Sequence, residues 1–406
     1  MPLRRPALLL TTTLGALALG GCAIVIAGEE TASAPMPAPV ITEAEAAQPP
    51  RTAVEALAPF YAALDYDRPL APAGPGLPQS NAAITSIAFG SCNTSEREIP
   101  ILDTVAAQDH DLFMYLGDNV YGDADSDDAT LPELRAAYHM MAEREEFARL
   151  RAATPMIATW DDHDYGQNDM GGRFAFKGFA EQLFLDFWRA PSDDERRARE
   201  GVYTDYAFGP DGQRVQIIVL DTRYFRSDLT PTDERGAVGK ERYLPSDDPN
   251  QTMLGEAQWT WLEEALEEPA DLRLIATSIQ VHADGHGWEA WRTMPLERDR
   301  LYGLIDETGA EGVVFVSGDR HSAGIYVRRD VASYPLYEIT SSALNMSFRD
   351  ENNEPGPHRI GDMYAPVNYG VIEIDWSDRE LALQIRDLDG ETVREVEIDF
   401  DEIKAD

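Results

Sequence analysis

Residues 160–169 constrain this chain more than any other stretch of it. They hold four carboxylates, one imidazole and two side-chain amides, with a glycine at position 166. Residues 155–159, just before them, are predicted to form a short buried strand, so the polar cluster begins where a strand ends. Anionic groups crowded at the end of a core strand need something cationic to hold them together. The stretch therefore predicts a metal or catalytic site; the alternative is a solvated acidic loop.

The charge of the chain limits its partners. Asp and Glu number 73 against 34 Lys and Arg, which gives a formal net charge of −39. Such a surface repels phosphate backbones and anionic lipid headgroups, so we expect no nucleic-acid-binding surface. An anionic substrate needs local positive charge to approach, and a bound metal would supply it. We expect a monomer that acts on a small molecule.

The first 22 residues have the pattern of an export signal. Arg4 and Arg5 precede an apolar run that is too short for a stable membrane span. The run ends in Leu-Gly-Gly-Cys at 19–22, the pattern of a bacterial lipobox, so Cys22 would carry a lipid in the mature chain. We expect a periplasmic or outer-surface protein that is attached to the membrane only through Cys22. A cytoplasmic protein with an apolar start is the alternative, and general or twin-arginine export remains open.

Residues 23–80 are rich in Ala, Pro and Glu, which is typical of a mostly disordered linker. Within this segment, residues 54–64 carry enough apolar side chains for a helix that docks on the folded body. The linker would join the lipid anchor to a catalytic domain that starts at residue 81.

Residues 81–406 alternate predicted strands and helices, which indicates a single mixed α/β domain whose sheets are covered on both faces. Strands are predicted at 84–89, 111–116, 155–159, 203–208, 215–220, 272–278, 312–317, 323–328, 335–340, 370–375, 380–386 and 392–399. Helices are predicted at 99–107, 131–150, 177–189, 255–267 and 297–307, and residues 228–252 as a polar loop.

Groups of potential metal ligands follow five of these strands. They lie at 90–93, 117–123, 161–169, 280–286 and 318–321. The carboxyl edge of an open α/β sheet is where binding sites are built, so we expect these groups to meet there.

Five motifs carry a family resemblance. They are Phe-Gly-Ser-Cys at 89–92, Gly-Asp-Asn-Val-Tyr-Gly-Asp at 117–123, Trp-Asp-Asp-His-Asp at 160–164, Leu-Asp-Thr-Arg-Tyr at 220–224 and Ser-Gly-Asp-Arg-His at 317–321. On these motifs the body resembles the alkaline phosphatase D family of calcineurin-like metallophosphoesterases. The resemblance implies a sandwich of two mixed β-sheets flanked by helices, with a two-metal site along one edge.

The resemblance also implies an activity. Members hydrolyse phosphate monoesters and diesters, here for extracytoplasmic phosphate release, with a hydroxide that bridges the two metals. The chain departs from its relatives in two places. The Ala/Pro-rich linker stands where many carry an extra N-terminal β-domain, and residues 164–167 stand where relatives often have Glu and paired Asn.

Roles for individual residues follow from the same resemblance. Similarity to purple acid phosphatases implies Fe(III) with a second metal, which we expect to be Ca²⁺, or otherwise Mg²⁺, Mn²⁺ or Zn²⁺. Asp118 would bridge the ions. Cys92, Tyr121 and His321 would complete the iron site, and Asp162, Asp319 and Asn168 would hold the second ion. His163 would act as general acid or transition-state stabiliser, and Arg320 would contact phosphate or orient Asp319.

Other polar residues near the motifs have plainer interpretations. Asp161 and Asp164 are expected to support the ligands, and Asp221 with Arg223 to form a structural ion pair under the site. His282 and His286 remain open between the rim of the site and a surface loop. A single cysteine after a strand is often just a small buried side chain, so that alternative stays open for Cys92.

A non-enzymatic, Ca²⁺-stabilised surface lipoprotein with the same fold is the competing class. Cys92, Tyr121 and His163 separate the two, because a purely structural Ca²⁺ site needs neither a thiolate nor an imidazole. An esterase or lipase is less consistent with the sequence, which holds no Gly-x-Ser-x-Gly motif. The natural substrate, and any preference for monoesters or diesters, are left open.

Overall fold

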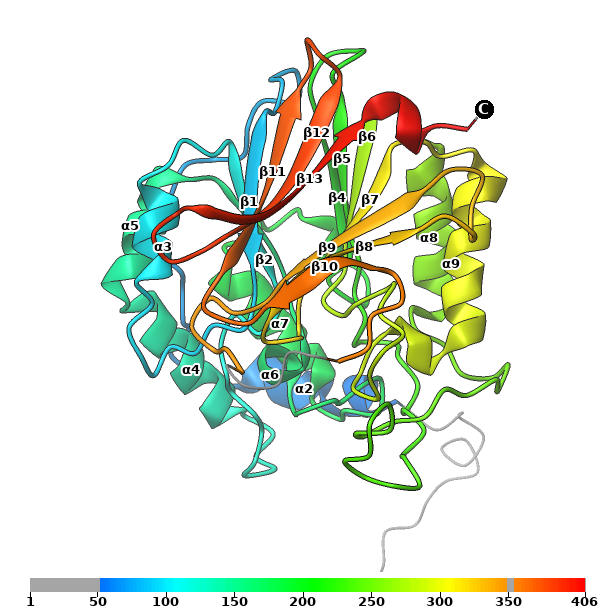
Figure 1. Cartoon of the computed structure of the whole chain (residues 1–406). Helices are drawn as coiled ribbons and strands as arrows, with labels where there is room; N and C mark the ends of the chain where they lie inside the picture. Colours follow the sequence, from blue (N-terminus) through cyan, green and yellow to red (C-terminus); the bar gives the residue numbers. More distant parts are fainter. Residues whose placement is uncertain (1–51, 349–353, 406) are drawn as a thin grey trace, which may run out of the picture. The chain divides into compact units, whose positions relative to one another are not determined.

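Strands β1 (Ser86–Gly90) and β2 (Leu112–Leu116) are buried on both faces, and this explains their continuous apolar sequence. Alternate side chains of β1 and β2 enter two different cores. Phe89 and Met114 pack between the two sheets, whereas Ala88 and Tyr115 face a layer of helices. The computed structural model describes residues 52–348 and 354–405, and Figure 1 shows their arrangement.

The first sheet has the strand order β13-β12-β11-β1-β2-β3. Strands β1, β2 and β3 run parallel, and β11 pairs antiparallel with β1. Its remaining strands are β3 (Met156–Thr159), β11 (Tyr369–Asp375), β12 (Glu380–Arg386) and β13 (Thr392–Asp399).

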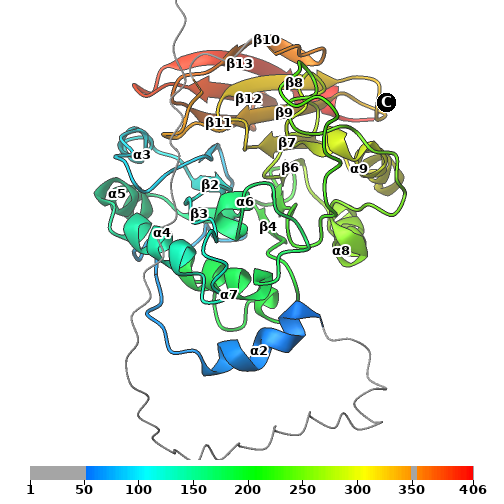
Figure 2. The same ribbon diagram turned by 90° about the horizontal axis from the view of Figure 1, so that it is seen from below.

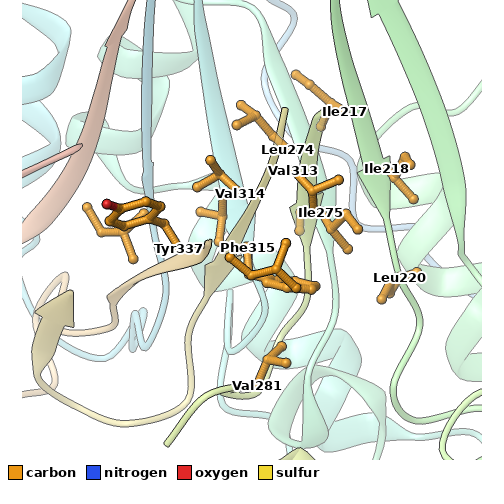
Figure 3. Packing of buried hydrophobic residues seen from close by; sticks show 14 of the residues in the cluster. Ile217, Ile218, Leu220, Leu274, Ile275, Val281, Val313, Val314, Phe315 and Tyr337 are labelled. Carbon is orange, nitrogen blue, oxygen red and sulfur yellow. The ribbon is translucent and has the colours of Figure 1, made fainter. Parts of the chain in front are cut away.

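The second sheet has the order β10-β8-β9-β7-β6-β5-β4, in which β5, β6, β7 and β9 are mutually parallel. Its strands are β4 (Thr204–Phe208), β5 (Val215–Val219), β6 (Leu272–Ala276), β7 (Val313–Ser317), β8 (Ala323–Arg328), β9 (Leu336–Ser341) and β10 (Arg359–Tyr364). Figure 3 shows side chains of these central strands, among which Ile217, Leu274 and Val314 are register partners on one face of the sheet. Burying each such side chain stabilises the fold by about 1.5–3 kcal/mol.

Helices cover the outer face of each sheet (Figures 1 and 2). α3 (Ile101–Ala106), α4 (Pro132–Ala142), α5 (Glu145–Ala153) and α7 (Lys177–Phe187) pack on the first sheet. α8 (Gly255–Glu267) and α9 (Pro295–Thr308) pack on the second. The predicted class, two mixed sheets flanked by helices in an α/β domain, is confirmed. Within the described residues, no helix combines the length and the apolar character that a membrane crossing requires.

The single helix predicted at 131–150 is wrong, because the chain breaks there into α4 and α5. Arg144 takes an extended backbone conformation (φ −69°, ψ 122°), and its Nε donates to the carbonyl oxygen of Ser95 at 2.6 Å. The apolar spacing continues across the break, so periodicity alone does not reveal it. β10 and the short helix α6 (Asp162–Tyr165) were not predicted.

The folded body begins earlier than the predicted boundary at residue 81. The helix expected at 54–64 is present as α2 (Ala53–Ala63), and Tyr61 stacks on Phe179 of α7 with ring centroids 4.6 Å apart. Beyond α2, the Ala71 amide donates to the Phe187 carbonyl oxygen at 2.9 Å. Residues 52–80 are therefore packed against the domain, in spite of their linker-like composition. The predicted signal, Cys22 and the linker up to residue 51 lie outside the described residues.

Candidate metal centre

Four of the five predicted ligand groups meet where parallel strands end. Cys92 follows β1, and Asp118 and Tyr121 follow β2. Asp162 and His163 open α6 just after β3, and Asp319 and His321 follow β7. The site thus draws residues from both sheets, at the edge that the sequence indicates.

Close approach of the loops requires glycine at two positions. A Cβ on Gly117, which has a φ of +93°, would lie 2.4 Å from the Cβ of Asp161. A Cβ on Gly318 would lie 2.5 Å from the Oγ of Ser91, which directly follows β1 of the other sheet. These contacts leave no room for a side chain, so both glycines let ligand loops touch.

Four of the predicted ligands have left-handed backbone conformations. Their φ angles are 58° at Cys92, 48° at Asp118, 62° at Asp319 and 53° at His321. This conformation costs an L-residue about 1–2 kcal/mol, with Asp tolerating it best. Such strain persists where the surrounding structure enforces it, and it concentrates at functional sites.

The first ligand group joins a thiol, a carboxylate and an imidazole. The ligand atoms of Cys92, Asp118 and His321 all lie within 4.8 Å of one another. The Tyr121 hydroxyl lies 3.0 Å from Oδ2 of Asp118 and 3.5 Å from Nε2 of His321. His321 Nδ1 lies 2.6 Å from the Met346 carbonyl oxygen, which can only accept. Nδ1 therefore carries the proton, and Nε2 is left to bind a cation.

The second ligand group consists of carboxylates alone. Oxygens of Asp118, Asp161, Asp162 and Asp319 lie within 4.8 Å of one another. Asp118 belongs to both groups, which is the arrangement that a bridging ligand requires. Its Oδ1 is buried and makes no hydrogen bond within the described residues. An orphaned carboxylate oxygen at this point suits a bound cation.

The raised pKa values of the buried acidic groups also indicate that this site needs positive charge to keep them ionised. Burial raises the pKa of Asp118 and of Asp161 well above the ordinary range. Burial and the neighbouring Asp162 raise the pKa of Asp319 to about 7. Burial raises the pKa of the Cys92 thiol to about 12. Cations would stabilise all four groups in their ionised forms, so the residues fit a metal centre.

His163 lies beside the ligands and is held by a partner that the sequence did not indicate. Its Nδ1 lies 2.6 Å from Oδ2 of Asp123, and its ring packs on Tyr121 with centroids 4.3 Å apart. Burial acts against a charged imidazole, but Asp162, Asp118 and Asp123 outweigh it and raise the pKa of His163 to about 11. The only available signal for Asp123 was its place at the end of the 117–123 motif.

A buried arginine, Arg223, contacts the carboxylates of Asp161 and Glu289. Arg223 Nε donates to Oδ1 of Asp161 at 2.6 Å, and Arg223 Nη1 lies 2.7 Å from Glu289 Oε2. The predicted ion pair between Arg223 and Asp221 is therefore wrong. Asp221 instead accepts from the Trp160 indole and from the backbone amide of Arg223, each at 2.9 Å. Asp161 thus contacts Arg223 and also belongs to the carboxylate ligand group, whereas Glu289 was missed.

His282 and His286 belong to neither of the places left open for them. His282 is fully buried, with Nδ1 2.9 Å from the Tyr302 hydroxyl and Nε2 3.0 Å from the Leu336 carbonyl oxygen. Nε2 of His286 lies 3.0 Å from Oε1 of Gln280. Both imidazoles are satisfied core groups, and burial lowers the pKa of each well below its ordinary value.

A cleft of about 450 Å³ gives access to the ligands. Its lining includes His163, Asn168, Trp288 and Arg320. The Arg320 guanidinium pairs with Glu354 rather than with Asp319. Asp164 accepts from the backbone amide of Asp161 at 2.6 Å, which holds the α6 turn in place. The predicted ligand Asn168 is exposed at the cleft edge, where its backbone amide donates to Asp123 Oδ1 at 2.8 Å.

Comparison with known proteins agrees with this architecture. Two solved structures share the fold. A structure of PhoD has a TM-score of 0.60 and 18% identity, covering 81% of this chain and 74% of that one. A structure of GAP50, described as the anchor in the inner membrane complex of Plasmodium, has a TM-score of 0.52 and 12% identity, covering 78% and 89%.

Sequence comparison identifies the family. Alkaline phosphatase D of Bacillus subtilis (strain 168) is 25% identical over 280 residues, which are 61% of this chain. The chain spans about half the length of that relative, 47%. The PhoD-like phosphatase family matches residues 87–369, well over half of the chain and all of the ligand loops. The chain therefore belongs to the PhoD-like phosphatase family.

Proposed function

We propose that the protein is a metal-dependent hydrolase of phosphate esters, active on monoesters, diesters or both. The observation that carries this proposal is the shared position of Asp118. It belongs to two adjoining ligand groups, and His163 lies within reach of both. Membership of a phosphatase family and the access cleft support the same activity.

The residues divide the chemistry among them. The two ligand groups would hold cations, which would supply an activated water and charge neutralisation at the phosphoryl oxygens. His163 donates a proton to the departing ester oxygen or stabilises charge there, and Asp123 fixes its orientation through Nδ1. Arg320 lines the cleft, and we expect a guanidinium nitrogen that does not pair with Glu354 to contact a phosphoryl oxygen.

A purely structural role for the site is less consistent with its composition. The GAP50 likeness shows that this fold also occurs in a protein described as an anchor, so the fold alone does not decide. A Ca²⁺ site that only stabilises the chain would use oxygen ligands. A thiol and two imidazoles converge here with the carboxylates, and this favours catalysis.

Metal analysis and a substrate pair test the proposal together. The purified protein is expected to contain two cations per chain and to hydrolyse 4-nitrophenyl phosphate, bis(4-nitrophenyl) phosphate or both. Chelation should abolish turnover, and reconstitution should restore it. A protein that gains thermal stability from its cations but hydrolyses neither ester would be a structural metalloprotein.

We further propose Fe(III) in the first ligand group and a hard cation, Ca²⁺ first, in the second. Thiolate, phenolate and carboxylate together suit a trivalent ion, whereas carboxylates alone suit Ca²⁺ or Mg²⁺. In such a centre Tyr121 would give the protein a visible charge-transfer colour.

Cys92→Ala is expected to lower iron content and turnover together, because it removes one ligand of this ion. Tyr121→Phe is the matched variant: it should bleach or shift the visible band while the fold survives. Iron analysis and the absorption spectrum measure both effects. Wild-type iron occupancy in Cys92→Ala would return Cys92 to the role of a small buried side chain.

The proposed setting is outside the cytoplasm, as a monomer anchored by a lipid on Cys22. The export pattern and lipobox support it. Cys22→Ser should abolish incorporation of labelled fatty acid and release the protein from the membrane fraction. Unchanged fractionation would remove the anchor from the proposal.

A further inference from the structure

A second cleft, of about 490 Å³, opens beside the catalytic one. Asn168, Asp169 and Arg242 line both clefts, so the two adjoin. Its other lining residues are Pro231, Thr232, Arg235 and Tyr243. They lie within the segment that the sequence indicated only as a polar loop.

The wall of this second cleft is a fixed hairpin. The Thr232 amide donates to the Arg242 carbonyl oxygen at 2.8 Å, and Pro231 and Tyr243 form a backbone bridge. The amides of Arg242 and Tyr243 both donate to the Gly287 carbonyl oxygen, at 3.0 and 2.7 Å. These bonds tie the backbone of the hairpin to the loop that carries Trp288 and Glu289.

The carboxylate of Asp169, which lines this cleft, already has an ion-pair partner and a hydrogen-bond donor. Asp169 Oδ2 pairs with Arg242 Nη1 at 2.5 Å and accepts from the Tyr243 hydroxyl at 2.8 Å. The Asp169 amide also donates to Asp162, a predicted metal ligand, at 2.6 Å. The Arg242 guanidinium stacks on the Trp288 ring, 5.1 Å from its centroid. The carboxylate therefore holds Arg242 in place and leaves little uncompensated negative charge.

The guanidinium of Arg235 adds a positive charge to this cleft. Within residues 52–348 and 354–405 it has no ion pair or hydrogen bond, although the chain carries a net charge of −39. The neighbouring Lys240, in contrast, pairs with Asp233 at 2.8 Å. Thr232 Oγ1 accepts from the Glu234 amide at 3.2 Å, so its own proton is available to a ligand.

We infer that this second cleft is a subsite for a further anionic group of the substrate, such as a second phosphate. Arg235 is its specificity-determining residue. A planar guanidinium binds phosphate oxygens in a bidentate manner, and the Thr232 hydroxyl adds a donor. The inference rests on the proposed function for the scissile phosphate in the adjoining cleft. The favoured substrate is then a phosphoester that carries two anionic groups.

Two chromogenic diesters that differ by one phosphate test the subsite. Thymidine 5′-(4-nitrophenyl phosphate) has a neutral 3′ end, and its 3′-phosphorylated form adds the second anion. Wild type should favour the phosphorylated ester in kcat/KM, and Arg235→Ala should reduce that ratio about tenfold, mostly through KM. Arg235→Lys should restore part of it. Lys240→Ala is the matched control, because it removes a cation from the same hairpin but outside the cleft, and should leave the ratio unchanged.

A binding measurement that needs no turnover tests the subsite independently of the proposed hydrolase activity. Calorimetry of the metal-loaded protein with thymidine 5′-phosphate and thymidine 3′,5′-bisphosphate should show tighter binding of the bisphosphate, with the difference lost in Arg235→Ala. If that holds while neither the diesters nor 4-nitrophenyl phosphate is hydrolysed, the subsite stands and the hydrolase proposal fails. An equal ratio in wild type and Arg235→Ala, or an equal loss in Lys240→Ala, would overturn the subsite.

Discussion

Replacing His163 with alanine is expected to lower turnover by about 10²–10⁴-fold while the bound metals stay in place. The side chain touches Tyr121 and Asp123 beside the ligands and lines the catalytic cleft. Removing it would take away the proposed proton donor for the departing oxygen and leave the proposed ligands Cys92, Asp118 and His321 in place. Steady-state kinetics beside metal analysis measure the two effects separately.

Two variants sharpen the test of His163. Asp123→Asn keeps an oxygen near Nδ1 but removes the charge, so it should reduce turnover less than His163→Ala and shift the pH profile. His139→Ala removes a more exposed imidazole on α4 and should match wild type. Loss of metal together with activity in His163→Ala would make this residue a ligand rather than a proton donor.

Asp118→Asn is expected to remove most of the bound metal and about 10³-fold or more of the activity. A shared ligand is lost, and the charge stabilisation that metals give a transition state amounts to several kcal/mol. The variant should still fold, because asparagine tolerates the left-handed conformation that Asp118 adopts at φ 48°. Metal analysis, kinetics and circular dichroism report the three effects.

The same variant should stabilise the metal-free protein. Burial raises the pKa of Asp118 in the folded state, so the folded chain resists its ionisation. Wild-type stability is therefore progressively lost as pH rises above the unfolded-state pKa, about 4, and asparagine removes this penalty. We expect Asp118→Asn to gain about 2 kcal/mol in the free energy of unfolding at pH 8 and much less at pH 5. Urea unfolding of chelated proteins measures this, with the exposed Asp109→Asn as control. A gap between variant and wild type that is the same at both pH values would contradict the argument.

Much of the fold and of the metal centre could be predicted because both depend on local patterns. Apolar runs such as 112–116 predict buried strands, and a ligand directly after a strand is placed by the strand itself. Cys92, Asp118, Asp162 and His321 all follow that rule.

The parts of the fold and of the site that could not be predicted depend on contacts between segments distant in the sequence. His282 also follows a strand, yet its partners are Tyr302 and Leu336, which no local pattern reveals. Arg223 lies two residues from Asp221 but pairs with Asp161, 62 residues away. The packing of α2 on α7 and the hairpin beside the catalytic cleft are likewise invisible in composition.

The distribution of ligands over two sheets bears on when the protein acquires its metals. Cys92 and Asp118 follow strands of the first sheet, whereas His321 follows β7 of the second. During synthesis the first ligands emerge more than two hundred residues before the last, so an iron site of this composition is complete only after both sheets have formed. Binding by the full ligand set would then follow the folding of both sheets. The compartment in which the chain folds would supply the cations, and in the proposed extracytoplasmic setting the choice between threaded and folded export would decide which metal pool that is.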